Sequence, residues 1–131
     1  MTVGIKSKYF GCIWKNMFIT AMTMPDRIDL KNKNHVLKQK RFKQFYGLFK
    51  YTIPCKYCRD YTKDVLEKKY PLNFSGRVPL MKSLYIWKKA VSDKLIAQGC
   101  DFTKPSPPFE VILARYEKLK ARCDKKIGKC V

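Results

Sequence analysis

Residues 51–60 read Tyr-Thr-Ile-Pro-Cys-Lys-Tyr-Cys-Arg-Asp, and the rest of the chain is organised around them. Cys55 and Cys58 form a Cys-x-x-Cys pair directly after Pro54, between two segments with helical hydrophobic spacing. Proline is favoured at the first position of a helix, because its missing N–H would have no partner there. The pair is therefore predicted to lie in a first helical turn, where the helix dipole and nearby Lys56 and Arg59 lower a thiol pKa. The sequence thus predicts a redox-active dithiol.

Three other interpretations of this pair are a zinc site, a thioredoxin-like motif and a structural disulfide. A structural zinc ion needs four ligands, and the sequence offers one histidine, His35, and no second Cys-x-x-Cys. A thioredoxin-like motif needs a preceding strand, whereas the residues before Pro54 have helical spacing. No metal site is therefore predicted. A purely structural short disulfide stays open, because spacing alone does not exclude it.

The composition bounds the class of protein and of partner. A chain of 131 residues is long enough for one domain with a real core. Lys and Arg total 29 against 10 Asp and Glu, which gives a net charge of +19. Such a charge favours acidic partners, namely an acidic protein, a membrane surface or nucleic acid. Because the lysines are spread over most segments, a solvated surface without a specific partner explains them equally well.

No membrane span and no secretory signal are expected. The longest apolar stretches fall well short of the ~20 residues that a spanning helix needs. Residues 6–24 combine a basic start with an apolar run, but Trp14-Lys15-Asn16 interrupts it and no clear cleavage site follows. We therefore expect no secretion by a recognisable signal peptide.

Apolar residues recur at spacings of three and four and predict an all-α fold. The predicted helices cover residues 9–24, 34–52, 54–69, 79–98 and 108–122. Pro25, the residue before Pro54, and Gly99 fall at expected helix ends. The predicted architecture is a four-helix bundle with a fifth, short helix, forming a domain over 1–122. Residues 123–131 are predicted to be a basic tail with a cysteine pair.

The order and spacing of these pieces resemble the Erv/ALR family of FAD-linked sulfhydryl oxidases, especially its viral members. That family's first helix opens with aromatic-Gly-x-x-x-Trp and its apolar run ends in Pro-Asp. Phe10-Gly11-Cys-Ile-Trp14 and Pro25-Asp26 stand in those places. Pro54-Cys55-Lys-Tyr-Cys58-Arg59 matches the Pro-Cys-x-x-Cys-Arg motif of viral members. The resemblance covers roughly residues 9 to 100.

The resemblance implies an enzyme that oxidises dithiols to disulfides and passes electrons through FAD to oxygen, giving hydrogen peroxide. Cys55 would exchange with a thiol-containing protein substrate, and Cys58 would face the isoalloxazine ring. The implied FAD contacts are Gly11, Trp14, Phe18, Trp87, Lys88, Val91 and Lys94. Aromatic side chains would stack on the flat rings and a lysine would meet the pyrophosphate. The resemblance also implies a homodimer and, if the protein is viral, a place in the host cytoplasm or the virion.

The sequence also departs from the family pattern. The Gly-to-Trp spacing is one residue shorter, and Phe18 stands where the family has a histidine. Residues 87–92 occupy the place of the flavin-binding His-Asn-x-x-Asn motif without matching it. Core packing would account for each aromatic residue as well. A second interpretation is therefore a structural or virion protein that has the oxidase fold, lacks the cofactor and binds acidic partners through its charge.

The remaining cysteines allow two interpretations. Family members carry a second pair on a flexible tail that relays electrons, and Cys123 and Cys130 are the candidates for this shuttle disulfide. A small loop-closing disulfide explains these two cysteines equally well. Cys100 lies near one half of a structural disulfide of the family, for which Cys12 or a tail cysteine would be a substitute partner. Cys12 is otherwise expected to be a buried thiol.

Overall fold

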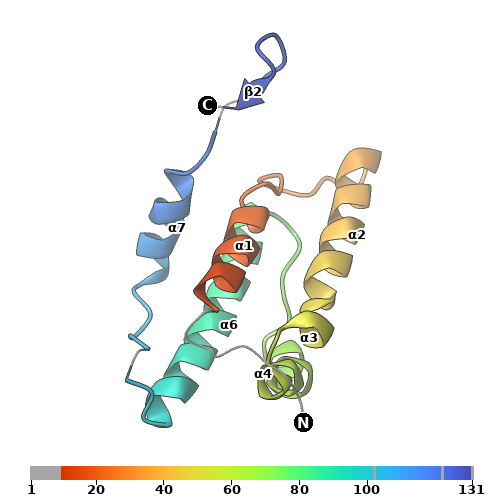
Figure 1. The fold of residues 1–131 in the computed structure, drawn as a ribbon. Coiled ribbons are helices and arrows are strands. Elements are labelled where there is room, and N and C mark those ends of the chain that lie inside the picture. The colour runs from red at the N-terminus through yellow and green to blue at the C-terminus, as the bar shows by residue number, and fades with distance from the viewer. Residues whose placement is uncertain (1–9, 102, 122, 131) are drawn as a thin grey trace.

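The described residues form an all-α fold, as the sequence predicts, together with a short hairpin near the C-terminal end that the sequence did not predict. A computed structural model describes residues 10–101, 103–121 and 123–130 (Figure 1). The helices are α1 (Gly11–Ala21), α2 (Lys33–Gly47), α3 (Phe49–Thr52), α4 (Lys56–Tyr61), the π-helix η2 (Thr62–Leu66), α5 (Glu67–Lys69), α6 (Arg77–Ala97) and α7 (Phe109–Glu117). Strands β1 (Cys123–Asp124) and β2 (Lys129–Cys130) form the antiparallel hairpin. Among the described residues, no helix is both long and apolar enough to cross a membrane.

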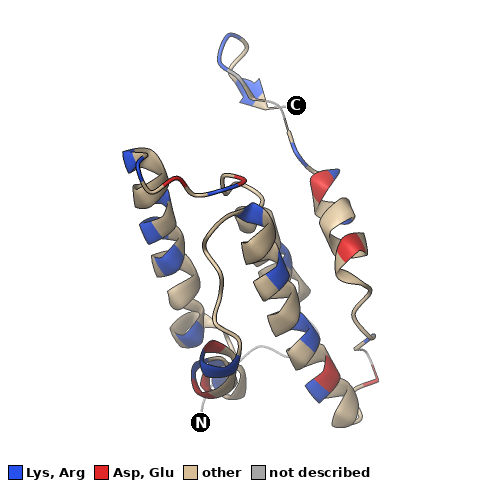
Figure 2. Ribbon diagram, turned by 180° about the vertical axis from the view of Figure 1, so that it is seen from behind, with Lys and Arg blue, Asp and Glu red and all other residues tan. Residues whose placement is uncertain are grey.

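Positive charge is distributed unevenly over the helices (Figure 2). Helix α2 carries lysine and arginine but no acidic residue along its whole length. Helix α7 carries two acidic residues, Glu110 and Glu117. The basic character is therefore strongest on one outer helix of the fold.

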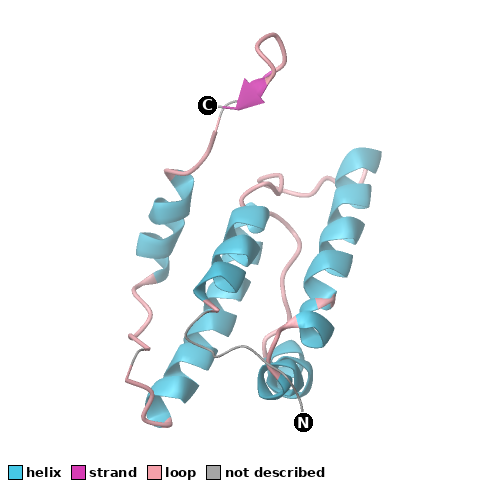
Figure 3. Ribbon diagram, in the orientation of Figure 1, coloured by secondary structure: helices cyan, strands magenta, loops and turns pink. Residues whose placement is uncertain are grey.

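Helix boundaries follow local sequence signals, with one break that the sequence analysis missed (Figure 3). The side chain of Asn32 caps α2 by accepting hydrogen bonds from the backbone N–H groups of Asn34 and His35. The predicted helix over 34–52 is two helices, because α2 ends at Gly47, a poor helix former, and α3 begins at Phe49. The predicted last helix over 108–122 is shorter and ends at Glu117.

The end of α6 confirms the expected role of Gly99. This glycine has a φ of 82°, in the left-handed region that favours glycine. Its N–H bonds to the carbonyl of Ile96, and the N–H of Cys100 bonds to the carbonyl of Leu95. This pair of bonds is the Schellman arrangement that terminates many helices.

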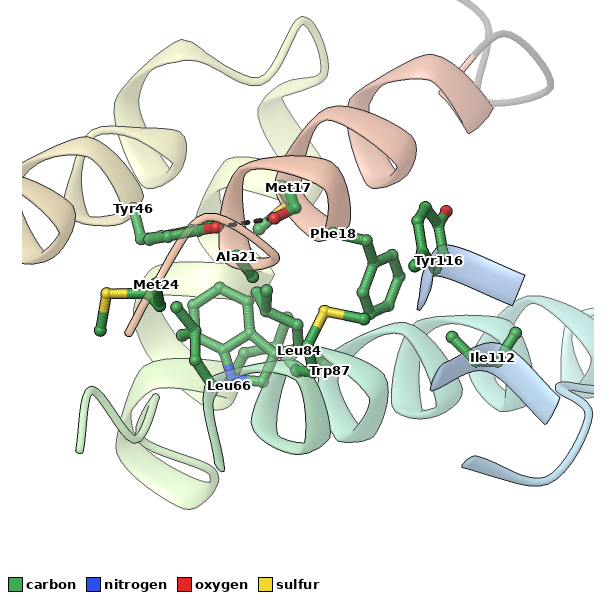
Figure 4. Close-up of a cluster of buried hydrophobic side chains, with 12 residues drawn as sticks. Met17, Phe18, Ala21, Met24, Tyr46, Leu66, Leu84, Trp87, Ile112 and Tyr116 are labelled. Atoms are coloured by element: carbon green, nitrogen blue, oxygen red, sulfur yellow. Dashed lines mark hydrogen bonds between the residues drawn. The ribbon is translucent and has the colours of Figure 1, made fainter. Parts of the chain in front are cut away.

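The core lies between α1, α2, α6 and α7 (Figure 4). Its fully buried side chains include Met17 and Ala21 of α1, Leu84 and Trp87 of α6, and Tyr46 of α2. The Tyr46 hydroxyl donates to the Met17 carbonyl at 2.6 Å. The Trp87 indole N–H donates to the Tyr70 carbonyl, also at 2.6 Å. Both buried donors are thus satisfied, as a stable core requires.

Backbone hydrogen bonds between two loops hold the end of α1 against the start of α6. The N–H of Ile28 bonds to the Ser75 carbonyl at 2.9 Å, and the N–H of Arg77 bonds to the Pro25 carbonyl at 3.0 Å. Between these bonds, a Cβ at Gly76 would lie 2.2 Å from the Asp26 carbonyl oxygen. Only glycine permits this close approach of two backbones. Helices α1 and α6 are therefore held antiparallel, with the other ends of the pair facing the redox motif.

Candidate redox site

The Cys-x-x-Cys pair lies where a loop enters α4. Cys55 is the N-cap residue, with an extended backbone, and its Sγ accepts a hydrogen bond from the Cys58 N–H at 3.3 Å. Pro54 precedes the cap and does not occupy the first helical position, so that prediction is wrong. Cys58 lies in the first turn as predicted, and the capping contact places both sulfurs on the same side of the turn.

The two thiols contact one another directly. Cys58 Sγ donates to Cys55 Sγ at a distance of 2.6 Å. Burial, together with this hydrogen bond and the charge of Cys55, raises the pKa of Cys58 to about 12. The prediction that the pKa of Cys58 is lowered is wrong, because burial outweighs the nearby positive charges of Lys94 and Arg59. Cys55 Sγ accepts two hydrogen bonds, one from the Cys58 N–H and one from Cys58 Sγ.

A cavity of about 380 Å³ opens beside the pair, between α1, α4, η2 and α6. Its walls include Trp14, Tyr61 and Trp87 together with both cysteines. The volume lies within the roughly 300–1,000 Å³ typical of small-molecule sites, and the walls are mostly apolar, as in such sites. The cavity thus places a reactive sulfur pair against a space that is large enough for a flat ligand.

A second cavity, of about 490 Å³, lies at the other end of α1. It is lined by Met24, Arg77, Tyr116 and Lys120 among others, and it contains neither cysteine of the pair. We place the functional site at the smaller cavity, because reactive side chains and a concave surface meet only there among the described cavities.

Four of the predicted cofactor contacts line the cavity beside the cysteines. They are Trp14, Trp87, Val91 and Lys94. Val91 follows Trp87 by four residues and Lys94 follows Val91 by three, which places all three on one face of α6. The structure brings these four residues together at one cavity, and their role toward a cofactor stays a prediction.

Three predicted contacts lie elsewhere, which corrects their placement. The Phe18 ring lies in the core and stacks on Tyr116, with centroids 5.2 Å apart. Lys88 points toward α7, where burial and the charge of Arg115 lower its pKa. Gly11 is exposed at the start of α1. Phe18 and Lys88 each follow a cavity residue by one position, and one helical step of 100° turns a side chain away from the wall.

Tyr61 is a cavity residue that the sequence analysis did not select. The Lys94 ammonium lies 3.9 Å from the centroid of its ring, which is a close cation–π contact. The available signal was its spacing, because Tyr61 follows Cys58 by three residues and so shares its helix face. Aromatic walls, one cation and an adjacent sulfur pair form a chemical set that fits the flat ring system of a flavin.

The second cysteine pair lies far from the first. Cys123 and Cys130 form a disulfide across the β1–β2 hairpin. Figure 1 shows this hairpin beyond the end of α7, at the end of the molecule opposite α4. Within one chain in this conformation, the tail disulfide therefore does not meet Cys55 or Cys58.

The other predicted residues have simpler surroundings. Cys12 is exposed on α1, so the expectation of a buried thiol is wrong. Cys100 is half-buried with its sulfur 3.1 Å from the Thr103 hydroxyl. His35 accepts a hydrogen bond from the Asp29 N–H through Nδ1, near the start of α2, as expected of a residue at a helix cap. Over the described part of the chain, no three His, Cys, Asp or Glu side chains gather where they would hold a metal ion.

The chain matches no family model and no curated protein. What the site does is therefore inferred from its residues and their geometry.

Proposed function

We propose that the protein is an FAD-dependent thiol oxidase that converts dithiols of a protein substrate to disulfides. One observation carries this proposal: the Cys55–Cys58 pair opens onto a cavity with aromatic walls and a cation, Lys94. A structural disulfide has no need of such a cavity. The resemblance of the motif order to sulfhydryl oxidases supports the same reaction.

The chain's own residues would carry out thiol–disulfide exchange. In the oxidised pair, a substrate thiolate attacks Cys55 Sγ, which forms a mixed disulfide and releases Cys58 as a thiolate. The second substrate thiol, as thiolate, then attacks the substrate sulfur of that mixed disulfide and releases Cys55. The substrate leaves as a disulfide, and the pair has gained two electrons and two protons. FAD, when bound, accepts these electrons and passes them to oxygen.

The surroundings of Cys58 change during this exchange. Burial is the main cause of its raised pKa and persists throughout. The hydrogen bond with Cys55 and the charge of Cys55 also raise the pKa, and both are removed while Cys55 is held in the mixed disulfide. The positive charges of Lys94 and Arg59, which lower the pKa, then act on the departing sulfur. The Cys58 thiolate is therefore less disfavoured in the mixed disulfide than in the reduced pair.

The visible absorption spectrum of the purified protein tests the proposal. We expect a flavin band that bleaches when a dithiol is added without oxygen, and that returns when oxygen is admitted. The Cys58→Ser variant is the control, since it should keep the band and fail to bleach it. A wild-type protein that shows no band after incubation with FAD contradicts the proposal.

A second candidate is a protein with this fold that binds no cofactor and serves as a structural or virion component. Two observations favour it: Phe18 and Lys88 point away from the cavity, and the +19 charge suits acidic partners. A colourless protein with an intact helical circular dichroism spectrum and no dithiol oxidation would support this candidate.

A further inference from the structure

Large apolar side chains close to Cys55 in the sequence are exposed. Leu48 is 55% exposed, Tyr51 62% and Tyr57 84%. The Tyr51 N–H bonds to the Leu48 carbonyl, so these two side chains share one turn of helix directly before the motif. Tyr57 follows Cys55 by two residues and also borders the cavity. We call Leu48, Tyr51, Lys56 and Tyr57 the Cys55 rim.

The stretch of chain that contains this rim, residues 30–59, is positively charged. No acidic residue occurs between Asp29 and Asp60, whereas nine lysines and arginines do. Lys50 is neutralised by Glu67 at 3.0 Å. Lys56 is exposed, and the Arg59 guanidinium bonds to the Ile53 carbonyl at 2.6 Å and has no acidic partner among the described residues. Asp60, just beyond the rim, is the nearest exposed negative charge along the chain.

We propose that the Cys55 rim binds the substrate segment that carries the dithiol, and that it selects segments with acidic residues beside an apolar anchor. This inference rests on the proposed oxidase function and names its substrate class. The exposed rings and Leu48 provide an apolar contact, and Lys56 and Arg59 provide charge complementarity. An acidic protein segment satisfies both features. Nucleic acid supplies the charge but no aliphatic anchor for Leu48.

Thiol–disulfide exchange at Cys55 tests the substrate class without any flavin. The full-length chain carries Cys12→Ser, Cys58→Ser and Cys100→Ser, so that Cys55 is its one reduced cysteine. Two peptides share a cysteine and a neighbouring leucine and differ in flanking glutamates or lysines, and each is activated as a 2-thiopyridyl disulfide. The Cys55 thiolate attacks the peptide sulfur, forms the mixed disulfide and releases pyridine-2-thione, whose absorbance gives the rate.

We expect the acidic peptide to react about tenfold faster than the basic one at low ionic strength, with the ratio falling as salt is added. Lys56→Glu should lower or invert the ratio. Lys82→Glu is the matched control, because it makes the same charge change on an exposed position of α6 outside the cavity. Tyr51→Ser should slow both peptides relative to the thiopyridyl disulfide of mercaptoethanol, which reports the reactivity of Cys55 itself.

Equal rates for the two peptides at every salt concentration overturn the inference. An effect of Lys82→Glu as large as that of Lys56→Glu also overturns it, because the preference would then come from net charge and not from the rim. Failure of the oxidase proposal is separate, since it appears as a wild-type protein that does not oxidise dithiothreitol.

Discussion

The ammonium of Lys94 lies over the ring of Tyr61, 3.9 Å from its centroid, and both side chains border the cavity that contains Cys58. The aromatic face holds the charge in place, because a cation is attracted to the negative face of a ring. Lys94 is one of two positive groups that lower the pKa of Cys58 against the larger effect of burial. Helix α6 thus supplies charge to a sulfur on α4.

Replacing Lys94 by methionine should make Cys58 harder to ionise. The variant is made in the Cys55→Ser background, and the alkylation rate of Cys58 by iodoacetamide is measured against pH. We expect the midpoint to move to higher pH, because a favourable charge is lost. Lys89→Met is the control, since Lys89 is exposed and paired with Asp93 at 2.7 Å. A midpoint that does not move would show that Lys94 has no effect on Cys58.

The two cysteines should differ in reactivity in the reduced protein. The pKa of Cys58 is raised to about 12, so its proton is lost only as the pH approaches that value. At pH 8 we expect iodoacetamide to label Cys55 first. Trypsin separates the two sites into fragments 51–56 and 57–59, which mass spectrometry quantifies. Faster labelling of Cys58 contradicts the hydrogen-bond direction described above.

The same shift affects stability in alkaline solution. The thiol of an unfolded cysteine has a pKa near 9.0, whereas burial raises the pKa of the folded Cys58 thiol to about 12. This contribution to stability is fully present below pH 9 and is lost as the pH rises from 9 to 12. Urea unfolding of the reduced protein should therefore show a steeper alkaline loss of stability than that of Cys58→Ser.

Serine at either position of the pair should abolish dithiol oxidation. Cys55→Ser removes the sulfur that the substrate attacks, and Cys58→Ser removes the sulfur that it displaces. Both variants should keep the wild-type circular dichroism spectrum, because both positions are only partly buried. Oxygen consumption with dithiothreitol measures the loss, and full turnover in either variant contradicts the mechanism.

Cys123→Ser should slow the oxidation of a protein substrate more than that of dithiothreitol, if the tail disulfide relays electrons. Since the hairpin and α4 lie at opposite ends of the folded molecule, the relay would act between two copies. A mixture of Cys123→Ser and Cys58→Ser proteins should then oxidise a protein substrate faster than either alone. Equal effects of Cys123→Ser on both substrates would identify the tail disulfide as structural.

Gly76→Ala should destabilise the fold by about 1–3 kcal/mol, the usual range for overpacking. The added Cβ would lie 2.2 Å from a backbone oxygen, that of Asp26, so the loop itself must shift. Gly47→Ala is the matched control, since nothing lies within 4 Å of its Cβ position. In the last turn of α2 it should be neutral or stabilising by up to ~1 kcal/mol. Urea unfolding of both variants compares them, and equal stabilities contradict the close approach.

Much of the fold follows from local sequence signals. The spacing of apolar residues predicts the all-α class, and Asn32 and Gly99 sit where cap chemistry requires. Neither the break at Leu48 nor the hairpin over 123–130 was predicted, because neither segment is long enough to show a hydrophobic period. Strands β1 and β2 have two residues each and are joined by the Cys123–Cys130 disulfide, so the hairpin depends on this covalent bond and not on a hydrophobic pattern in the sequence.

The site was predicted less completely because it depends on helical phase and on burial. Trp87, Val91 and Lys94 share one face of α6, but Lys88 is turned by 100° and faces α7. The raised pKa of Cys58 depends on which helices cover the sulfur, and motif spacing carries no information about that cover. Tyr61 shows that helix spacing, applied outward from Cys58, finds a wall residue that motif matching misses.

The close approach of Gly76 to Asp26, with a backbone hydrogen bond on each side of it, joins α1 to α6 at one end. That end of the helix pair is therefore fixed. The other ends of the two helices, at Trp14 and Lys94, border the cavity and are held there by side-chain packing. Side-chain packing yields to small rotations more readily than a backbone held by hydrogen bonds on both sides of a glycine. We therefore expect the cysteine end of the helix pair to adapt more easily than the glycine end, so that the width of the cavity can adjust while the hydrogen-bonded loops keep the helices in register.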